Sequence, residues 1–353
     1  MNLSDRKWEP FELEDLFDIQ SGKRLESYNF VDGKRPFIGA IDDNNGITAY
    51  VSNTNSSLDK NVLGVNYNGN GMVISFYHPY ECIFTDDVKR FHLKYYPDDE
   101  NVFLFFKVII LQQKKKYNYG YKFNALRMNR QKILVPVNKN GDPDYGFMHD
   151  FIKEHNQKLV NNGLTFFKKK IANLQTEQIE SLDKKKWEPF FISGDSGVFK
   201  LRSSNSGIDK NKLLDSNYLY IPYITRSYFN NGYNMFVGEK QQDSYSIDNG
   251  NVISIGLDTQ SVFYQPYQFY TGQNIQVLYS DKLNELNALF IAPLLKKQLQ
   301  KFNWGGNGAT LGRLSRTKIL LPVKNKEPDF DYMETYIRNI MIRQCKAYID
   351  YKK

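Results

Sequence analysis

The sequence has few of the residues on which covalent cross-links, metal sites and nucleophilic catalysis depend. Its 353 residues include only two cysteines, Cys82 and Cys345, and four histidines. Two distant cysteines suggest neither a disulfide framework nor a zinc motif, and the histidines have no ligand spacing. We therefore expect no metal site and a reducing, cytoplasmic environment.

Signatures of catalysis and of membrane insertion are also missing. The chain has no Walker A motif, no dinucleotide-binding glycine fingerprint and no Asn/Asp-Pro-Pro-Tyr-type loop. Residues Met1–Pro10 are polar, which argues against a signal peptide. The longest apolar run, Val102–Leu111, contains Lys107 and is too short to cross a bilayer. These absences favour a non-catalytic protein.

Positive charge and aromatic side chains are plentiful instead. The chain holds 47 lysines and arginines against 39 aspartates and glutamates, a net charge of +8, which favours a polyanionic partner. Its 25 tyrosines and 25 phenylalanines suit stacking on bases or sugars. A tyrosine-rich β-sheet core would have the same composition, so both readings stay open.

The chain also repeats itself. Three segments recur at an offset between 179 and 187 residues: KWEPF at 7–11 and 186–190, KILVPV at 132–137 and KILLPV at 318–323, and PDYGFM at 143–148 and PDFDYM at 328–333. A period this long indicates domain duplication rather than a solenoid. Each unit of about 180 residues is large enough to bury a core of its own.

Each unit reads as an α+β structure. Short runs of β-branched and aromatic residues, separated by glycine, proline and aspartate, predict small mixed or antiparallel sheets. A helix is expected near 102–116 and again near 282–302. A longer helix should follow each Pro-Asp pair, with Asp144 and Asp329 as N-caps.

The two long helices set the expected boundaries. The first should run from about 145 toward 186, with a weak point at residues 161–163, and the second over 330–351. We expect them to pair antiparallel in a pseudo-twofold arrangement. The predicted parts are a sheet-containing domain at 1–142, a helix at 143–186, a second such domain at 187–327 and a helix at 328–353.

This plan resembles the specificity subunits of type I restriction–modification systems and the similar subunits of type IIB systems. The likeness rests on the ordered, duplicated set of segments above, together with LFDI at 16–19, SGKR at 21–24 and YGYKF at 119–123. It covers nearly the whole chain, although no single motif is specific. One departure is residues 195–206, where a Gly/Ser-rich stretch replaces LFDI and SGKR.

The resemblance implies a function. Each target-recognition domain would read one half of a bipartite double-stranded DNA target, and the helices would set the spacing and dock methyltransferase (modification) subunits, through which a restriction subunit joins. The subunit itself would be non-catalytic and would bind no cofactor, because S-adenosylmethionine, ATP and Mg²⁺ would be bound by the partner subunits. The alternative is a duplicated aromatic-rich binding protein for carbohydrate or single-stranded nucleic acid.

Side chains that suit phosphates and base edges give the candidate DNA contacts. They are Lys23, Arg24, Asn68, Asn70, Lys89, Arg90, Tyr119, Tyr121, Lys122, Arg127 and Arg130 in the first unit, and Arg202, Arg226, Tyr228, Asn230, Gln260, Trp304, Asn307, Arg313 and Arg316 in the second. The symmetry-repeated pairs Arg127/Arg130 and Arg313/Arg316 are the strongest, with a framework salt bridge as their alternative role. The candidate partner contacts are Phe167, Ile171, Leu174, Leu182, Met333, Ile337 and Ile340.

Overall fold

The computed structural model describes residues 1–69, 71–118, 120–302 and 308–352. The chain divides into two compact units, Met1–Gly163 and Leu164–Lys353. Helix α4 (Tyr145–Ile171) continues past the boundary between them. The mixed α/β architecture with small sheets agrees with the predicted fold class.

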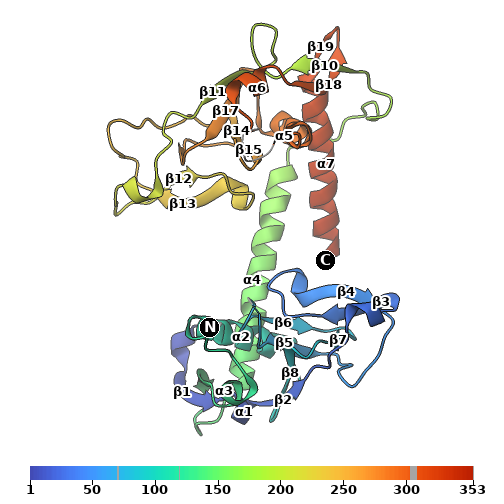
Figure 1. Cartoon of the computed structure of the whole chain (residues 1–353), viewed down its shortest axis with the longest axis vertical. Helices are drawn as coiled ribbons and strands as arrows, with labels where there is room; N and C mark the ends of the chain where they lie inside the picture. Colours follow the sequence, from blue (N-terminus) through green and yellow to red (C-terminus); the bar gives the residue numbers. More distant parts are fainter. Residues whose placement is uncertain (70, 119, 303–307, 353) are drawn as a thin grey trace. The chain divides into compact units, whose positions relative to one another are not determined.

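The first unit contains three small sheets (Figure 1). Strand β1 pairs with β9, a second sheet has the order β2-β8-β5-β6, and a third has the order β4-β3-β7. The strands are β1 (Lys7–Glu12), β2 (Phe17–Ser21), β3 (Asp32–Ile38), β4 (Ile47–Val51), β5 (Val62–Asn66), β6 (Ser75–His78), β7 (Ile83–Phe84), β8 (Val88–Leu93) and β9 (Lys132–Val137). The helices are η1 (Leu3–Asp5), α1 (Leu13–Leu16), η2 (Ser27–Asn29), η3 (Asn44–Gly46), α2 (Glu100–Leu111), η4 (Gln112–Lys116), α3 (Ala125–Asn129) and α4.

The second unit repeats this topology strand by strand. Its sheets have the orders β10-β18-β19, β11-β17-β14-β15 and β13-β12-β16. The strands are β10 (Trp187–Phe191), β11 (Lys200–Ser203), β12 (Ile221–Ile224), β13 (Tyr233–Val237), β14 (Val252–Gly256), β15 (Val262–Gln265), β16 (Tyr270–Thr271), β17 (Ile275–Tyr279), β18 (Lys318–Lys324) and β19 (Glu327–Pro328). The helices are η5 (Lys210–Lys212), η6 (Asn230–Gly232), α5 (Glu285–Leu299), α6 (Leu311–Ser315) and α7 (Phe330–Tyr351).

Matching contacts show that the sequence repeat is a structural one. Trp8 stacks on Phe105 at 6.1 Å between ring centroids, and Trp187 stacks on Phe290 at 6.0 Å. Each ring belongs to or packs against the main core cluster of its own unit. Two separate apolar cores follow, each able to stabilise its unit by burial.

Both Pro-Asp helix starts are capped as predicted. Asp144 Oδ1 accepts from the Phe147 amide at 2.9 Å, and Asp329 Oδ1 accepts from the Tyr332 amide at 3.0 Å. These carboxylates satisfy amides that have no partner inside the helix. The shorter helices α2 and α5 start later or end earlier than predicted, since residues 112–116 form the 3-10 helix η4.

The prediction that the first long helix reaches residue 186 is wrong. Helix α4 is continuous through residues 161–163 and ends at Ile171. The next residues bond to α7 instead of continuing their own helix: the Glu177 amide donates to Asn339 Oδ1 at 3.1 Å, and the Glu180 carbonyl accepts from Tyr332 Oη at 2.9 Å.

Within the second unit, residues 164–185 nevertheless run antiparallel to α7. Phe167 contacts Tyr348 with ring centroids 5.0 Å apart, Glu177 meets Arg338 at 2.6 Å, and Lys185 Nζ meets Asp329 at 2.9 Å. Antiparallel pairing is therefore correct for this stretch, but only its first part is helical.

Candidate nucleic-acid interface

The positive charge of the chain is concentrated in one segment of each unit. Residues 101–141 and 286–326 contain no aspartate or glutamate. They hold nine and eight of the 47 basic residues, so the rest of the chain carries more acidic than basic residues. Sequence reasoning identified single arginines here and missed the segments, although the absence of acidic residues is visible in the sequence.

In the first unit this segment lines two neighbouring clefts that share Tyr117. One has a volume of about 600 Å³ and the other about 460 Å³. Their basic lining residues are Lys114, Lys116, Lys122, Arg127, Arg130 and Lys132, and no acidic residue lines either cleft. A concave surface of one charge sign concentrates phosphate groups beside it.

Arg127 holds the loop that precedes it. Its Nη1 donates to the Lys122 carbonyl at 2.9 Å, and its guanidinium lies 3.9 Å from the centroid of the Tyr121 ring. Tyr121 in turn stacks on Tyr117 at 5.8 Å. The guanidinium therefore orders a tyrosine pair at the edge of the cleft.

Arg313 has the same local contact in the second unit. Its Nη1 donates to the carbonyl of Gly308 at 2.9 Å, five residues earlier, as Arg127 does to Lys122. The repeat of this arginine therefore reflects loop positioning by a main-chain hydrogen bond, and not the framework salt bridge that was its alternative role.

Arg130 and Arg316 are placed differently. They are the C-caps of α3 and α6, with φ/ψ of −85°/1° and −86°/−1°, and both side chains are exposed. A cation at a helix C-terminus is locally favoured, and its guanidinium extends into solvent. These two arginines are the best-placed repeated phosphate contacts.

Arg90 and Arg202 are tied to equivalent aspartates. Arg90 is 6% exposed and pairs with Asp59 at 2.8 Å, while Arg202 pairs with the buried Asp248 at 2.7 Å. The two aspartates are equivalent because each forms the isolated bridge to the strand before the last sheet strand, Asp59 with Cys82 and Asp248 with Phe269.

The arginine itself has changed strands between the units. Arg90 lies on β8 opposite Gln20, whereas Arg202 lies on β11 opposite Val277. A buried carboxylate requires a nearby cation, and either of two adjacent strands can supply it. We therefore correct the interpretation of Arg90 as a DNA contact to a framework role, and that of Arg202 likewise.

The basic pair near the first strand has no counterpart in the second unit. Lys23 and Arg24 are exposed, and Arg24 pairs with Glu26 at 2.6 Å. The equivalent connection between β11 and η5, residues 204–209, contains no lysine or arginine. Arg202 therefore does not replace Arg24.

Two further candidates of the first unit are held by neighbours. Lys89 Nζ donates to Ser21 Oγ at 2.8 Å and lies 4.5 Å from the Tyr67 ring centroid, and burial lowers the pKa of this lysine. Asn68 donates to Asp87 at 3.0 Å. Both residues border the basic clefts but are already engaged.

The loops after β12 and β14 distinguish the second unit. Arg226 pairs with Asp258, and Gln260 has a φ of 54° and donates to the Asp258 carbonyl at 2.7 Å. Tyr228 and Phe229 are 52% and 77% exposed, and Asn230 follows them in η6. The equivalent loop of the first unit carries Asp42 and Asp43, so one scaffold presents two different surfaces. Phe229 was not among the predicted contacts.

Four predicted contacts, Asn70, Tyr119, Trp304 and Asn307, lie outside the residues that the structure describes.

Most of the predicted partner contacts pack inside the second unit. Met333 is fully buried in its core and Ile337 packs against that core, while Phe167 contacts Tyr348. Ile171, Leu174 and Ile340 are half-buried, and Leu182 is 37% exposed. The expectation of an apolar docking stripe over these residues is wrong, because the stripe covers the core of its own unit.

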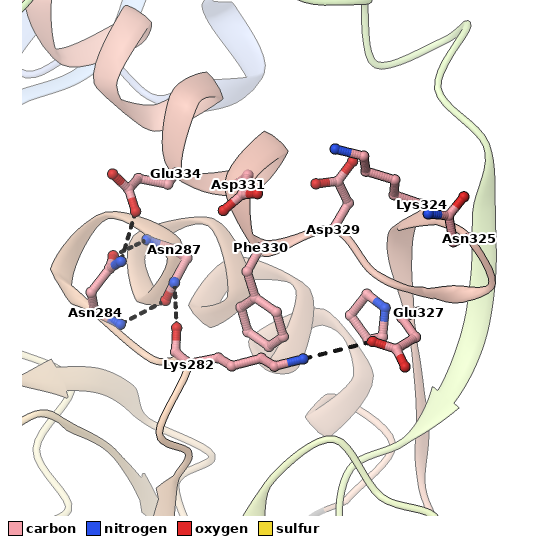
Figure 2. Close-up of a pocket in the computed structure, with 11 residues that line it drawn as sticks. Lys282, Asn284, Asn287, Lys324, Asn325, Glu327, Asp329, Phe330, Asp331 and Glu334 are labelled. Atoms are coloured by element: carbon pink, nitrogen blue, oxygen red, sulfur yellow. Dashed lines mark hydrogen bonds and ion pairs between the residues drawn. The ribbon is translucent and has the colours of Figure 1, made fainter.

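A polar pocket of about 480 Å³ lies at the start of α7 (Figure 2). Figure 2 shows Lys282 reaching Glu327 at 3.7 Å and Asn284 donating to Glu334 at 2.8 Å. Its four carboxylates, on Glu327, Asp329, Asp331 and Glu334, disfavour phosphate binding. In the described ranges, no group of three or more His, Cys, Asp or Glu residues is arranged to hold a metal ion.

Two histidines of the first unit titrate in opposite directions. Burial lowers the pKa of His78 to about 4, whereas hydrogen bonds from Asp98 and Asp59 raise that of His92 to about 9. His92 Nδ1 lies 2.7 Å from Asp98 and its Nε2 lies 3.0 Å from Asp59. It is a structural bridge between carboxylates.

Among the helices described, none has the length and apolar character needed to span a membrane.

Comparison with known proteins identifies related sequences and folds. The profile of the family described as "Type I restriction modification DNA specificity domain" matches residues 5–164 and 184–349. The "Type II restriction enzyme BgcI specificity subunit S.BcgI" of Heyndrickxia coagulans is 54% identical over 159 residues, which cover 45% of this chain and 46% of that protein. The match thus spans about half the length of this relative.

A solved structure shares the fold across the chain. The S subunit of a type I restriction–modification system from M. genitalium superposes with a TM-score of 0.55 and 14% identity, covering 100% of this chain and 94% of that one. Its two-domain fold agrees with the duplicated topology described above.

Proposed function

Because the chain belongs to the type I restriction modification DNA specificity family, we propose that it is the non-catalytic specificity subunit of a restriction–modification complex. Each unit reads one half of a bipartite double-stranded DNA target. Methyltransferase subunits, and through them a restriction subunit, assemble on it and bind S-adenosylmethionine, ATP and Mg²⁺. The family does not favour the alternative of a carbohydrate or single-stranded nucleic-acid binding protein.

One observation carries the DNA assignment. Two units with the same topology each hold an acid-free basic segment that ends in an exposed arginine at a helix C-cap. Duplicated phosphate-binding surfaces suit two half-sites on one duplex, since each unit can then grip the backbone and present its own loops to the bases. The differing loops after β3 and β12 supply the two specificities.

The same geometry narrows the list of DNA contacts. We propose Arg130, Arg316, Lys122 and Lys23 as phosphate contacts, with Arg127 and Arg313 ordering the loops beside them. In the second unit Arg226, Tyr228, Asn230 and Gln260 border the surface that meets the bases. Tyr121 and Asn68 have the corresponding place in the first unit.

The proposed spacing element is α4 together with α7. Since α4 is a continuous helix of 27 residues, a change in its length should alter the separation of the two half-sites that one chain reads. This is a proposal about assembly on DNA, and it is tested by a deletion described in the Discussion.

Methylation mapping tests the function directly. Long-read sequencing of the source organism should reveal a methylated bipartite motif that disappears when this gene is deleted and returns on complementation. An unchanged methylome after deletion would refute the proposal.

A binding experiment tests the phosphate contacts. Substituting Arg130→Ala together with Arg316→Ala should lower the dependence of log K on log salt by roughly two, at about 0.9 for each phosphate lost. The double variant Lys153→Ala with Lys346→Ala removes the same charge from exposed positions on α4 and α7 and serves as the control. Equal slopes for the two double variants would remove these arginines from the DNA surface.

A further inference from the structure

The first unit has an open apolar groove outside its basic clefts. The groove has a volume of about 440 Å³ and lies among β9, α2 and the start of α4. Two of its aliphatic side chains are prominently exposed, Val108 at 56% and Leu134 at 57%. The side chains that line it are Leu3, Trp8, Phe105, Val108, Ile109, Leu134, Phe151 and Ile152, with Gln112 and Gln113 at its edge.

The second unit builds the same frame from equivalent residues. Trp8 Nε1 donates to the Leu3 carbonyl at 2.9 Å, and Trp187 Nε1 donates to the Leu182 carbonyl at 3.0 Å. The edge-to-face ring contact also recurs: Phe105 meets the α4 ring at 5.8 Å, and its counterpart Phe290 meets the α7 ring at 5.5 Å. Equivalent chemistry is therefore expected at the two places.

A segment of the chain covers this frame in the second unit. Ile179, three residues before Leu182, packs against the core cluster that contains Phe290 and the neighbouring Tyr336. The segment is fixed on either side, since Glu177 pairs with Arg338 at 2.6 Å and the Glu180 carbonyl accepts from Tyr332. An extended segment with a branched aliphatic anchor and flanking carboxylates is thus what this kind of groove accepts.

The first unit retains the means to hold such a segment. Lys153 stands nine residues after the N-cap Asp144, as Arg338 stands nine residues after Asp329, and its side chain is exposed. It places a cation where Arg338 binds Glu177 in the second unit. The groove lining itself contains no charged residue, which disfavours a nucleic-acid occupant.

We propose that this groove is the docking site for an extended, acid-flanked peptide segment of the methyltransferase subunit, with a branched aliphatic side chain in the place that Ile179 takes in the second unit. The inference rests on the proposed function for the identity of the partner. A second copy of this chain is the weaker occupant, because its own Ile179 segment is already held by Arg338, Asn339 and the core of its unit.

A peptide titration tests the groove. The probe is a fluorescein-labelled synthetic peptide with the sequence of residues 173–185, added to the full-length chain and followed by anisotropy. Saturable binding is expected, and a peptide with Ile179→Asp should bind about tenfold or more weakly, since burial of such a side chain is worth roughly 1.5–3 kcal/mol. No saturable binding, or equal binding of both peptides, overturns the proposal.

A matched pair of variants locates the site. Leu134 and Leu320 occupy the same place on β9 and β18 and are 57% and 50% exposed, so lysine is tolerated at both. Leu134→Lys should abolish peptide binding, whereas Leu320→Lys should leave it unchanged. The reverse result would mean that the peptide displaces the chain's own segment in the second unit, and would overturn the proposal.

Co-purification identifies the occupant. A methyltransferase subunit that co-purifies with the wild-type chain should be lost from the Leu134→Lys chain and kept by the Leu320→Lys chain. Its retention by Leu134→Lys overturns the assignment of the groove while leaving the proposed function intact. Failure of any methyltransferase to co-purify with the wild-type chain counts against the proposed function itself, and against this partner for the groove.

Discussion

Replacing His78 by glutamine and Gly64 by serine copies into the first unit a buried polar arrangement that the second unit already has. His78 lies on β6, is 0% exposed, and neither ring nitrogen has a hydrogen-bond partner among the described residues. The equivalent Gln265 on β15 donates to Ser254 Oγ at 2.9 Å and to the Asn231 carbonyl at 3.1 Å. The strand registers match, because Val62 pairs with His78 and Val252 pairs with Gln265.

The pKa of His78 gives the size of the effect. Burial, with a smaller contribution from the charge of Lys107, lowers it to about 4, against about 6.5 in the unfolded chain. The unfolded state therefore binds the proton first, so stability is full above pH 6.5 and is lost as pH falls toward 4. The loss is about 2 kcal/mol at pH 5 and about 3 kcal/mol when complete, at 1.36 kcal/mol per pKa unit.

Hydrogen exchange measures this locally. The free energy of opening of the β5–β6 amides should fall by about 2 kcal/mol from pH 7 to pH 5 in the wild-type chain relative to the double variant, while the β14–β15 amides serve as the internal control. His92, whose raised pKa stabilises the fold below pH 6.5, is present in both proteins and cancels in the comparison. Gly64→Ser alone should destabilise the unit, because a Cβ there lies 3.0 Å from His78 Nε2. An identical pH dependence in wild type and double variant would refute the assignment of the buried neutral histidine.

Two further outcomes concern the framework and the spacing element. Arg202→Ala should destabilise the second unit by about 3 kcal/mol, because Asp248 loses its cation in a buried site. Adding Val277→Arg, which places the arginine where Arg90 stands in the first unit, should recover part of the lost thermal stability; no recovery would contradict the equivalence of the two sites. Deleting residues 153–159 shortens α4 by about two turns, or roughly 10 Å, and should change the tolerated gap between half-sites by about three base pairs. Methylation mapping that shows the original gap would discard α4 as the spacing element.

Local sequence patterns determined much of this protein. The repeated KWEPF, PV-strand and Pro-Asp segments predicted two α+β units, because a strand pairing and a helix cap need only a few neighbouring residues to form. The repeated Arg127 and Arg313 were recognised as important for the same reason, since each bonds to a carbonyl five residues earlier. The concentration of positive charge before β9 and β18 was equally open to sequence inspection.

Contacts between residues far apart in the chain decided the rest. Arg90 and Arg202 look like surface cations in the sequence, but Asp59 and Asp248 lie 31 and 46 residues from them and meet them only through the sheet register. The end of α4 at Ile171 likewise depends on α7, more than 150 residues later, which binds the segment that follows. The sequence alone therefore determined the repeat, the elements and the family, whereas which cations face solvent and where the long helix stops were decided by the tertiary structure, because a buried charge or an unpaired amide is satisfied by whatever partner the fold brings to it.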